Sequence, residues 1–188
     1  MLAGIDIAKV SAYSGVTITA NSESYTIPKG EKSYTFWDTS GLNEGDKGSV
    51  PAQEADEELI NLLKGMNVSL IIYLTRGHRF MNEVVSTKHM FDRIRSVCGE
   101  KVPIVLVVTG LEQWEVMDEW WTSNRSNIKG LKLSFQGHAC VTTIKGRNNI
   151  YETEYQESRN KVWKLVEEHC KPSVWKLAEG PSVWFLLR

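Results

Sequence analysis

The sequence lacks the features that mark several classes of protein. Its 188 residues include only three cysteines and five prolines, and no apolar run approaches the ~20 residues that cross a bilayer. Three scattered cysteines do not make a disulfide framework, which favours a reducing, cytoplasmic compartment. The first residues also lack the basic and apolar regions of a secretory signal. These absences argue against secreted, disulfide-rich and membrane-spanning proteins, and the length is typical of about one domain.

An excess of charge of either sign is also missing. Lys plus Arg total 22 and Asp plus Glu total 23, so the formal net charge is -1. A nucleic-acid or membrane-surface partner usually requires a strongly basic face, so neither is expected. Hydrophobic residues make up 41% and charged residues 24%, as in an ordinary globular protein.

Strand-like and helix-like segments alternate along the chain. Residues 22–27 and 32–37 are short β-prone runs separated by a Pro-Lys-Gly-Glu turn, which predicts a hairpin. Residues 68–74 and 103–108 are continuous apolar runs, the pattern of strands that are buried on both faces of a parallel sheet. A last strand is predicted over 138–142. The sequence therefore predicts an α/β fold with three layers.

Helical spacing of apolar residues fills the intervals between the strands. It predicts helices from about 51 to 65, around 84–98, from 113 to about 124, and around 155–169. In the third of these, Trp120 and Trp121 are neighbours about 100° apart, so one should be buried and the other at the boundary. Residues 171–188 follow as a weakly ordered or extended tail, in which Pro-Ser-Val-Trp occurs twice, nine residues apart. We expect a domain over 1–170 and a tail over 171–188.

Three motifs follow predicted strands, where α/β proteins bind their ligands. Asp38-Thr39-Ser40-Gly41 supplies a carboxylate that can hold a Mg²⁺-bound water and a glycine that lets the backbone approach a phosphate. The alternative is a strand-to-loop turn capped by Asp38. Thr109-Gly110-Leu111-Glu112 ends in a carboxylate that could accept two hydrogen bonds from a guanine edge. The alternative is a glycine turn followed by an acid at a helix start.

The third motif, Cys140-Val141-Thr142, begins a loop that could supply backbone contacts to a base. Each motif means little alone. Their order, with gaps of about 70 and about 30 residues, is the layout of a GTPase domain.

The wording of these segments resembles a known family. The segments 36–45, 70–77, 101–112 and 137–142 resemble P-loop GTPases of the septin-like and immune-associated group, and most closely a G-domain family of basidiomycete fungi. The resemblance extends over about residues 1–169. It implies a P-loop NTPase-like fold that binds GTP or GDP with Mg²⁺. It also implies a possible homodimer or other protein partner.

The same resemblance assigns roles to individual residues. Thr17 matches the first switch threonine, which closes on Mg²⁺ and the γ-phosphate, and Asp38 and Gly41 match the second switch. Thr17 and Asp38 are thus the expected Mg²⁺ residues. Glu112 matches the base-reading position, with Thr109 in the same motif and Thr142 in the following loop.

The sequence departs from the family pattern in the phosphate-binding part. It contains no G-x-x-x-x-G-K-[ST] segment, and residues 2–7 look like the end of the helix that follows that loop. We therefore expect a chain that begins inside the domain and a sheet that lacks its first, central strand. The strands at 32–37 and 68–74 would then lose ladder partners or pair directly.

Hydrolysis is expected to be weak or absent, because the phosphate loop is missing and Leu42 stands where a catalytic glutamine would position water. The resemblance thus implies a GTPase by ancestry but leaves open whether this chain is an enzyme. The alternative function is a nucleotide-independent pseudo-GTPase, a module that binds protein through the domain surface or the Trp-containing tail. Nucleotide-dependent behaviour distinguishes the two.

Overall fold

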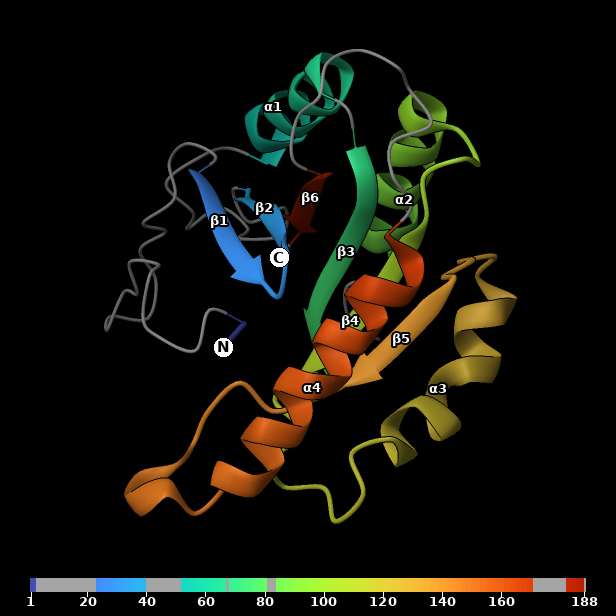
Figure 1. The fold of residues 1–188 in the computed structure, drawn as a ribbon. Coiled ribbons are helices and arrows are strands. Elements are labelled where there is room, and N and C mark those ends of the chain that lie inside the picture. Colours follow the sequence, from blue (N-terminus) through green and yellow to red (C-terminus); the bar gives the residue numbers. More distant parts are fainter. Residues whose placement is uncertain (3–22, 40–51, 67, 81–83, 171–181, 188) are drawn as a thin grey trace.

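The computed structural model describes residues 1–2, 23–39, 52–66, 68–80, 84–170 and 182–187, and contains one six-stranded sheet with helices on both faces (Figure 1). The strands are β1 (Glu23–Lys29), β2 (Lys32–Asp38), β3 (Val68–Arg76), β4 (Ile104–Thr109), β5 (Gly137–Cys140) and β6 (Ser182–Leu187). The helices are α1 (Ala52–Gly65), α2 (Val84–Cys98), α3 (Glu119–Gly130) and α4 (Glu152–His169), with a short 3-10 helix, η2, at Arg147–Asn149.

The sheet separates two hydrophobic clusters. Successive residues of β3 point to opposite faces, so Leu70 and Ile72 belong to the cluster with α4, whereas Ile71 and Tyr73 belong to the cluster with α1, α2 and α3. Figure 1 shows α4 crossing one face of the sheet. The α/β prediction is confirmed at this level: a largely parallel sheet is flanked by helices, which is compatible with a P-loop NTPase but not specific for it.

The hairpin and the buried strands lie close to where the sequence predicts them. β1 and β2 pair antiparallel, with Gly30 in the turn at a φ of +61°. β3 and β4 pair parallel and are buried along most of their length. In α3, Trp120 is buried and Trp121 is half-buried, which confirms the expected division between them.

Two predicted boundaries are wrong. The helix expected over 113–124 is instead α3 at Glu119–Gly130, because residues 111–118 form turns in which the Trp114 N–H donates to the Leu111 carbonyl. The strand expected over 138–142 ends at Cys140, two residues early. Val141 and Thr142 are still buried, and the Val141 N–H still donates to the Val108 carbonyl of β4 at 2.8 Å, so the burial that the sequence pattern reports continues past the end of the strand.

The centre of the sheet differs from both sequence expectations. The strand order is β1-β2-β6-β3-β4-β5, so β6 lies between β2 and β3 and pairs parallel with each. β2 and β3 neither lose a ladder partner nor pair directly, because the C-terminal segment supplies both ladders. The segment expected to be an extended tail thus contributes a central strand of the sheet.

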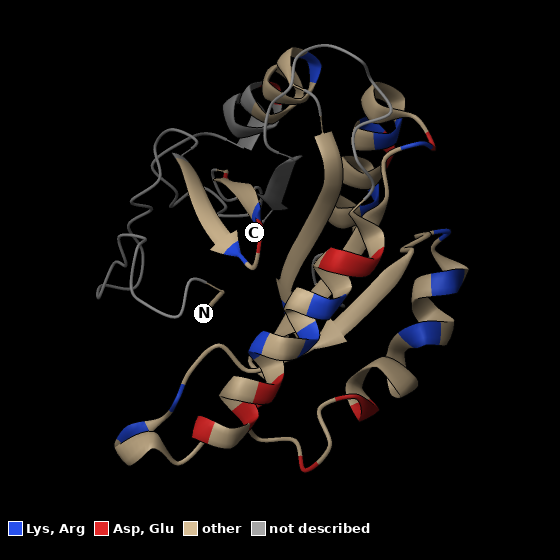
Figure 2. Cartoon of the chain, in the orientation of Figure 1, with Lys and Arg blue, Asp and Glu red and all other residues tan. Residues whose placement is uncertain are grey.

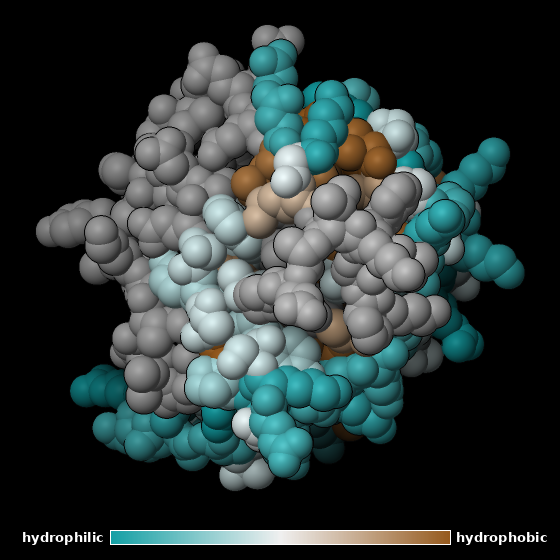
Figure 3. Space-filling model, turned by 45° about the horizontal axis from the view of Figure 1, so that its top comes forward, coloured by the Kyte–Doolittle hydropathy of each residue, from teal (hydrophilic) through white to brown (hydrophobic). Residues whose placement is uncertain are grey.

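The described residues on one face of the molecule are mostly polar. In the view of Figure 3, hydrophilic and near-neutral residues cover most of it, and hydrophobic residues show only in restricted patches. Figure 2 shows acidic residues at the start of α4, where Glu152 and Glu154 complement the positive end of the helix dipole. In the described part of the chain, no helix combines the length and apolarity needed to cross a bilayer.

Candidate functional site

The predicted site residues that the structure describes lie at one edge of the sheet. Asp38 is the last residue of β2, Thr109 is the last residue of β4, and Thr142 follows β5 by two residues. The strands β2, β6, β3, β4 and β5 are neighbours that all run parallel. These three residues therefore lie at the edge of the sheet formed by the carboxyl ends of its strands, the carboxyl edge, where α/β proteins bind ligands. Thr17 and Gly41 lie outside the described residues.

One contact joins two of the predicted residues directly. The Thr142 hydroxyl, Oγ1, donates to Oε2 of Glu112 at 3.2 Å. Thr142 is fully buried and Glu112 is half-buried, so the carboxylate is held at one end and reaches toward solvent at the other. The loops that follow β4 and β5 are therefore linked at the position where the resemblance implies base recognition.

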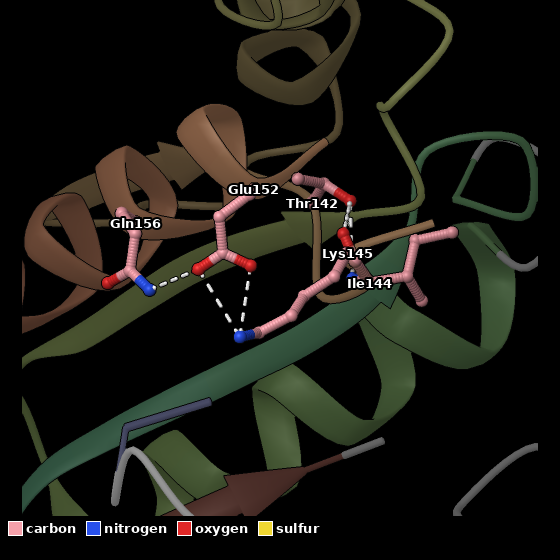
Figure 4. A network of polar contacts seen from close by, with 5 residues as sticks. All are labelled: Thr142, Ile144, Lys145, Glu152 and Gln156. Carbon is pink, nitrogen blue, oxygen red and sulfur yellow. Dashed lines mark hydrogen bonds and ion pairs between the residues drawn. The ribbon is translucent and has the colours of Figure 1, made fainter. Parts of the chain in front are cut away.

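Thr142 is itself fixed from two sides. Its backbone N–H donates to Oγ of Ser158, a fully buried residue of α4, at 3.0 Å. Its hydroxyl also lies 3.3 Å from both the N and O of Ile144, which closes a tight turn after β5 (Figure 4). Ser158 thus orients the residue that contacts Glu112. Sequence reasoning missed it because a serine on the apolar stripe of a helix carries no signal of its partner.

The loop after β5 is braced by a second network. Lys145 bridges to Glu152 at 3.0 Å, and Nε2 of Gln156 donates to the same carboxylate at 2.7 Å (Figure 4). The hydrogen bond from Gln156, followed by that from Lys145, lowers the pKa of Glu152. Nε2 of Gln113 donates to the Tyr151 hydroxyl at 3.0 Å, so this loop is also tied to the one after β4. The two loops form a single braced rim around Glu112.

Thr109 has a structural role at its strand end. Its hydroxyl donates to the Thr75 carbonyl at 3.2 Å, and its own carbonyl accepts the Gly77 N–H at 2.9 Å. Gly110 follows with a φ of +75°, which turns the chain toward Glu112. The Thr109 side chain therefore holds β3 and β4 together at the site edge, and Gly110 sets the direction of the loop.

Asp38 is placed apart from the Glu112 rim. It is 8% exposed at the end of β2, and both β6 and β3 lie between β2 and β4 in the sheet. A carboxylate oxygen is the ligand type that Mg²⁺ prefers, so Asp38 fits a magnesium role by its donor. No group of three or more metal-ligating side chains occurs among the residues that the structure describes.

The cysteines offer no nucleophile at this edge. Burial raises the pKa of Cys140, at the end of β5, to about 11. The same cause raises the pKa of Cys98 in α2 to about 11. Both thiols are protonated at neutral pH and therefore unreactive.

Comparison with known proteins adds no identification. No protein-family model matches the chain, and no curated protein matches it. The function is therefore inferred from the residues and their geometry.

Proposed function

We propose that the chain binds a guanine nucleotide, GTP or GDP, at the carboxyl edge of its sheet, with Glu112 recognising the base. The hydrogen bond between Thr142 and Glu112 carries this proposal, because it unites two separately predicted positions in one braced rim. The parallel strands that end at this edge are the usual support of a nucleotide site in an α/β protein.

The chemistry of Glu112 suits guanine. A carboxylate has about four acceptor positions on two oxygens, so the bond from Thr142 leaves room for a pair of donors. Guanine presents two adjacent donors, N1–H and its exocyclic amine, which such a pair of oxygens can accept together. Adenine presents an unprotonated ring nitrogen at the same place and would face the carboxylate with a lone pair.

Asp38 and Thr17 are the residues that would hold Mg²⁺ beside the nucleotide. When bound with nucleotide, Mg²⁺ neutralises phosphate charge. Asp38 would orient a metal-bound water, and Glu112 would hold the base. We propose weak or absent hydrolysis, because the sequence has neither the glycine-rich phosphate loop nor a glutamine at position 42.

A titration with a fluorescent GTP analogue, with and without Mg²⁺, tests the proposal. Glu112→Ala should weaken binding about 10- to 100-fold, since a hydrogen bond to a charged group is worth ~1.5–3 kcal/mol. Glu115→Ala, an exposed acid of the same loop, should leave binding unchanged. Asp38→Ala should reduce the gain that Mg²⁺ gives. Glu112→Gln should lose guanine and gain xanthine nucleotides, because an amide can donate to the carbonyl that xanthine carries. Equal binding by all variants would refute the assignment.

A nucleotide-independent protein-interaction module is the second candidate function. Exposed apolar side chains on the two loops around Glu112 favour it: Trp114 and Val116 after β4, and Ile144 and Ile150 after β5. A chain that unfolds cooperatively and binds no guanine nucleotide would support this function over the first. Capture of a partner should then be the same with and without GTP.

A further inference from the structure

The position of β6 divides the rest of the sheet into two parts. β1 and β2 form a hairpin, and β3, β4 and β5 form a continuous parallel block. β2 and β3 each pair with β6 and do not pair with each other. Among the described strands, β6 is therefore the one whose two hydrogen-bond ladders join the hairpin to the parallel block. A slot for one strand exists between them, and the C-terminal segment of the chain occupies it.

The register shows how completely this slot is filled. On one side Tyr34 to Asp38 pair with 182–186. On the other side Val68 pairs with 183 and Leu70 to Tyr73 pair with 184–187, with an irregularity in the register between Val68 and Leu70. In a parallel sheet each central residue directs its N–H and C=O to one neighbour, and successive residues alternate between neighbours. Residues 183–186 thus have a partner strand on both sides, whereas 182 pairs only with β2 and 187 only with β3. An empty slot would leave two rows of backbone groups without ladder partners.

The composition of the segment suits a central position. Residues 183–187 read Val-Trp-Phe-Leu-Leu, a continuous apolar run like those of β3 and β4. Such runs are typical of strands covered on both faces.

The chain carries a near copy of the same segment that does not fit. Residues 172–175 and 181–184 both read Pro-Ser-Val-Trp, but Lys176 stands where the second copy has Phe185. In the observed register, position 185 is paired with Trp37 and with the fully buried Ile71. A lysine there would place a charge in the middle of the sheet, at a large desolvation cost. The register of the slot therefore favours an apolar residue at position 185.

We propose that the slot between β2 and β3 is a strand-binding site whose ligand is the chain's own C-terminal segment, Ser182–Leu187, bound in cis. The recognition is β-strand addition: the backbone ladders give affinity, and the apolar sequence gives specificity. A peptide of the same sequence therefore competes for the slot or replaces a defective segment. The site is distinct from the Glu112 rim and does not depend on nucleotide binding.

Variants of the full chain test the ladder first. Phe185→Pro removes a backbone N–H from the centre of β6 and should lower the melting temperature or abolish cooperative unfolding. Phe185→Leu keeps that N–H and is the matched control, with a much smaller effect. Amide exchange should become faster in both β2 and β3 of the proline variant. Equal melting of the proline and leucine variants would overturn the proposal.

A peptide added in trans then tests the site. A fluorescein-labelled peptide of residues 182–188 should bind the Phe185→Pro chain saturably and restore slow exchange in β2 and β3. A peptide of residues 173–179, from the near copy with Lys176, should not. If the proline variant is unfolded, refolding it with the first peptide should recover a cooperative transition. Failure of both binding and recovery would overturn the proposal.

The mass of the wild-type chain in solution tests occupancy in cis. Light scattering after size exclusion should give a monomer at every concentration, because each chain fills its own slot. A concentration-dependent dimer that Phe185→Pro abolishes would show exchange of the segment between copies and overturn occupancy in cis.

Discussion

Replacing Trp163 tests the packing of α4 on the hairpin. Trp163 is 3% exposed and presents its ring to Tyr34, with centroids 5.3 Å apart, and to Phe36, with centroids 5.9 Å apart. Both contacts are edge-to-face, and the indole N–H also donates to the Leu2 carbonyl at 3.3 Å. A single side chain of α4 therefore contacts both aromatic residues on the face of β2 that is covered by α4.

The expected loss follows from these contacts. Truncating a buried tryptophan to alanine costs ~3–5 kcal/mol, which includes the cavity that it leaves. This is a large share of the roughly 5–15 kcal/mol that stabilises a domain. At about 2–4 °C per kcal/mol for a chain of this size, the melting temperature of Trp163→Ala should fall by roughly 6–20 °C. Trp163→Phe should lower the melting temperature less, because phenylalanine keeps an aromatic ring against Tyr34 and Phe36 and loses only the N–H donor and part of the ring volume.

Urea denaturation and thermal melting measure the effect, with Trp114→Ala as the matched control. Trp114 is 39% exposed, so its removal should lower the free energy of unfolding by much less than removal of Trp163. A Trp163→Ala chain as stable as the Trp114→Ala chain would refute the packing of α4 on the hairpin.

Three further perturbations probe α4 and β5. Ser158→Ala removes the acceptor of the buried Thr142 N–H and should cost about 1–3 kcal/mol in urea denaturation, whereas the exposed Glu157→Ala should cost little. Gly137→Ala would place a Cβ 2.5 Å from Nε2 of His169 and 2.7 Å from Cδ1 of Leu165, so it should lower the free energy of unfolding by ~1–3 kcal/mol. In the control variant Gly65→Ala the added Cβ meets nothing within 4 Å, so the change should be tolerated. Burial, opposed in part by Asp118, lowers the pKa of His138 below its ordinary 6.5 in the folded chain. As the pH falls, the unfolded chain therefore takes up a proton at this histidine at a higher pH than the folded chain does, and the free energy of unfolding should decrease below about pH 6.5. His138→Gln should remove the contribution of this residue to that pH dependence.

The local pattern of apolar residues predicts most of the secondary structure, because burial on one face produces a periodic pattern and burial on both faces produces a continuous apolar run. The continuous apolar runs of β3 and β4 and the apolar stripe of α4 are such patterns. The start of α3 left no such pattern. The indole of Trp120 donates to the Gly77 carbonyl at 3.0 Å, a contact with a residue 43 positions away that a sequence window cannot contain.

The candidate site divides in the same way. Asp38, Thr109 and Glu112 could be placed at strand ends from the sequence, because the strands before them are strongly apolar. The bond between Glu112 and Thr142 joins residues 30 positions apart and depends on the parallel pairing of β4 with β5. The support that Ser158 gives to Thr142 depends in addition on how α4 packs on the sheet.

The sequence by itself determined most of the apolar strands and amphipathic helices of this protein, since these are properties of a few consecutive residues, but it did not identify β6 as a strand. It also determined that 183–187 is an apolar run. Only the tertiary structure decided that this run completes the centre of the sheet between β2 and β3. Periodicity specifies which faces of a strand are buried but not which strands lie beside it, and that choice depends on backbone ladders between residues far apart in the chain.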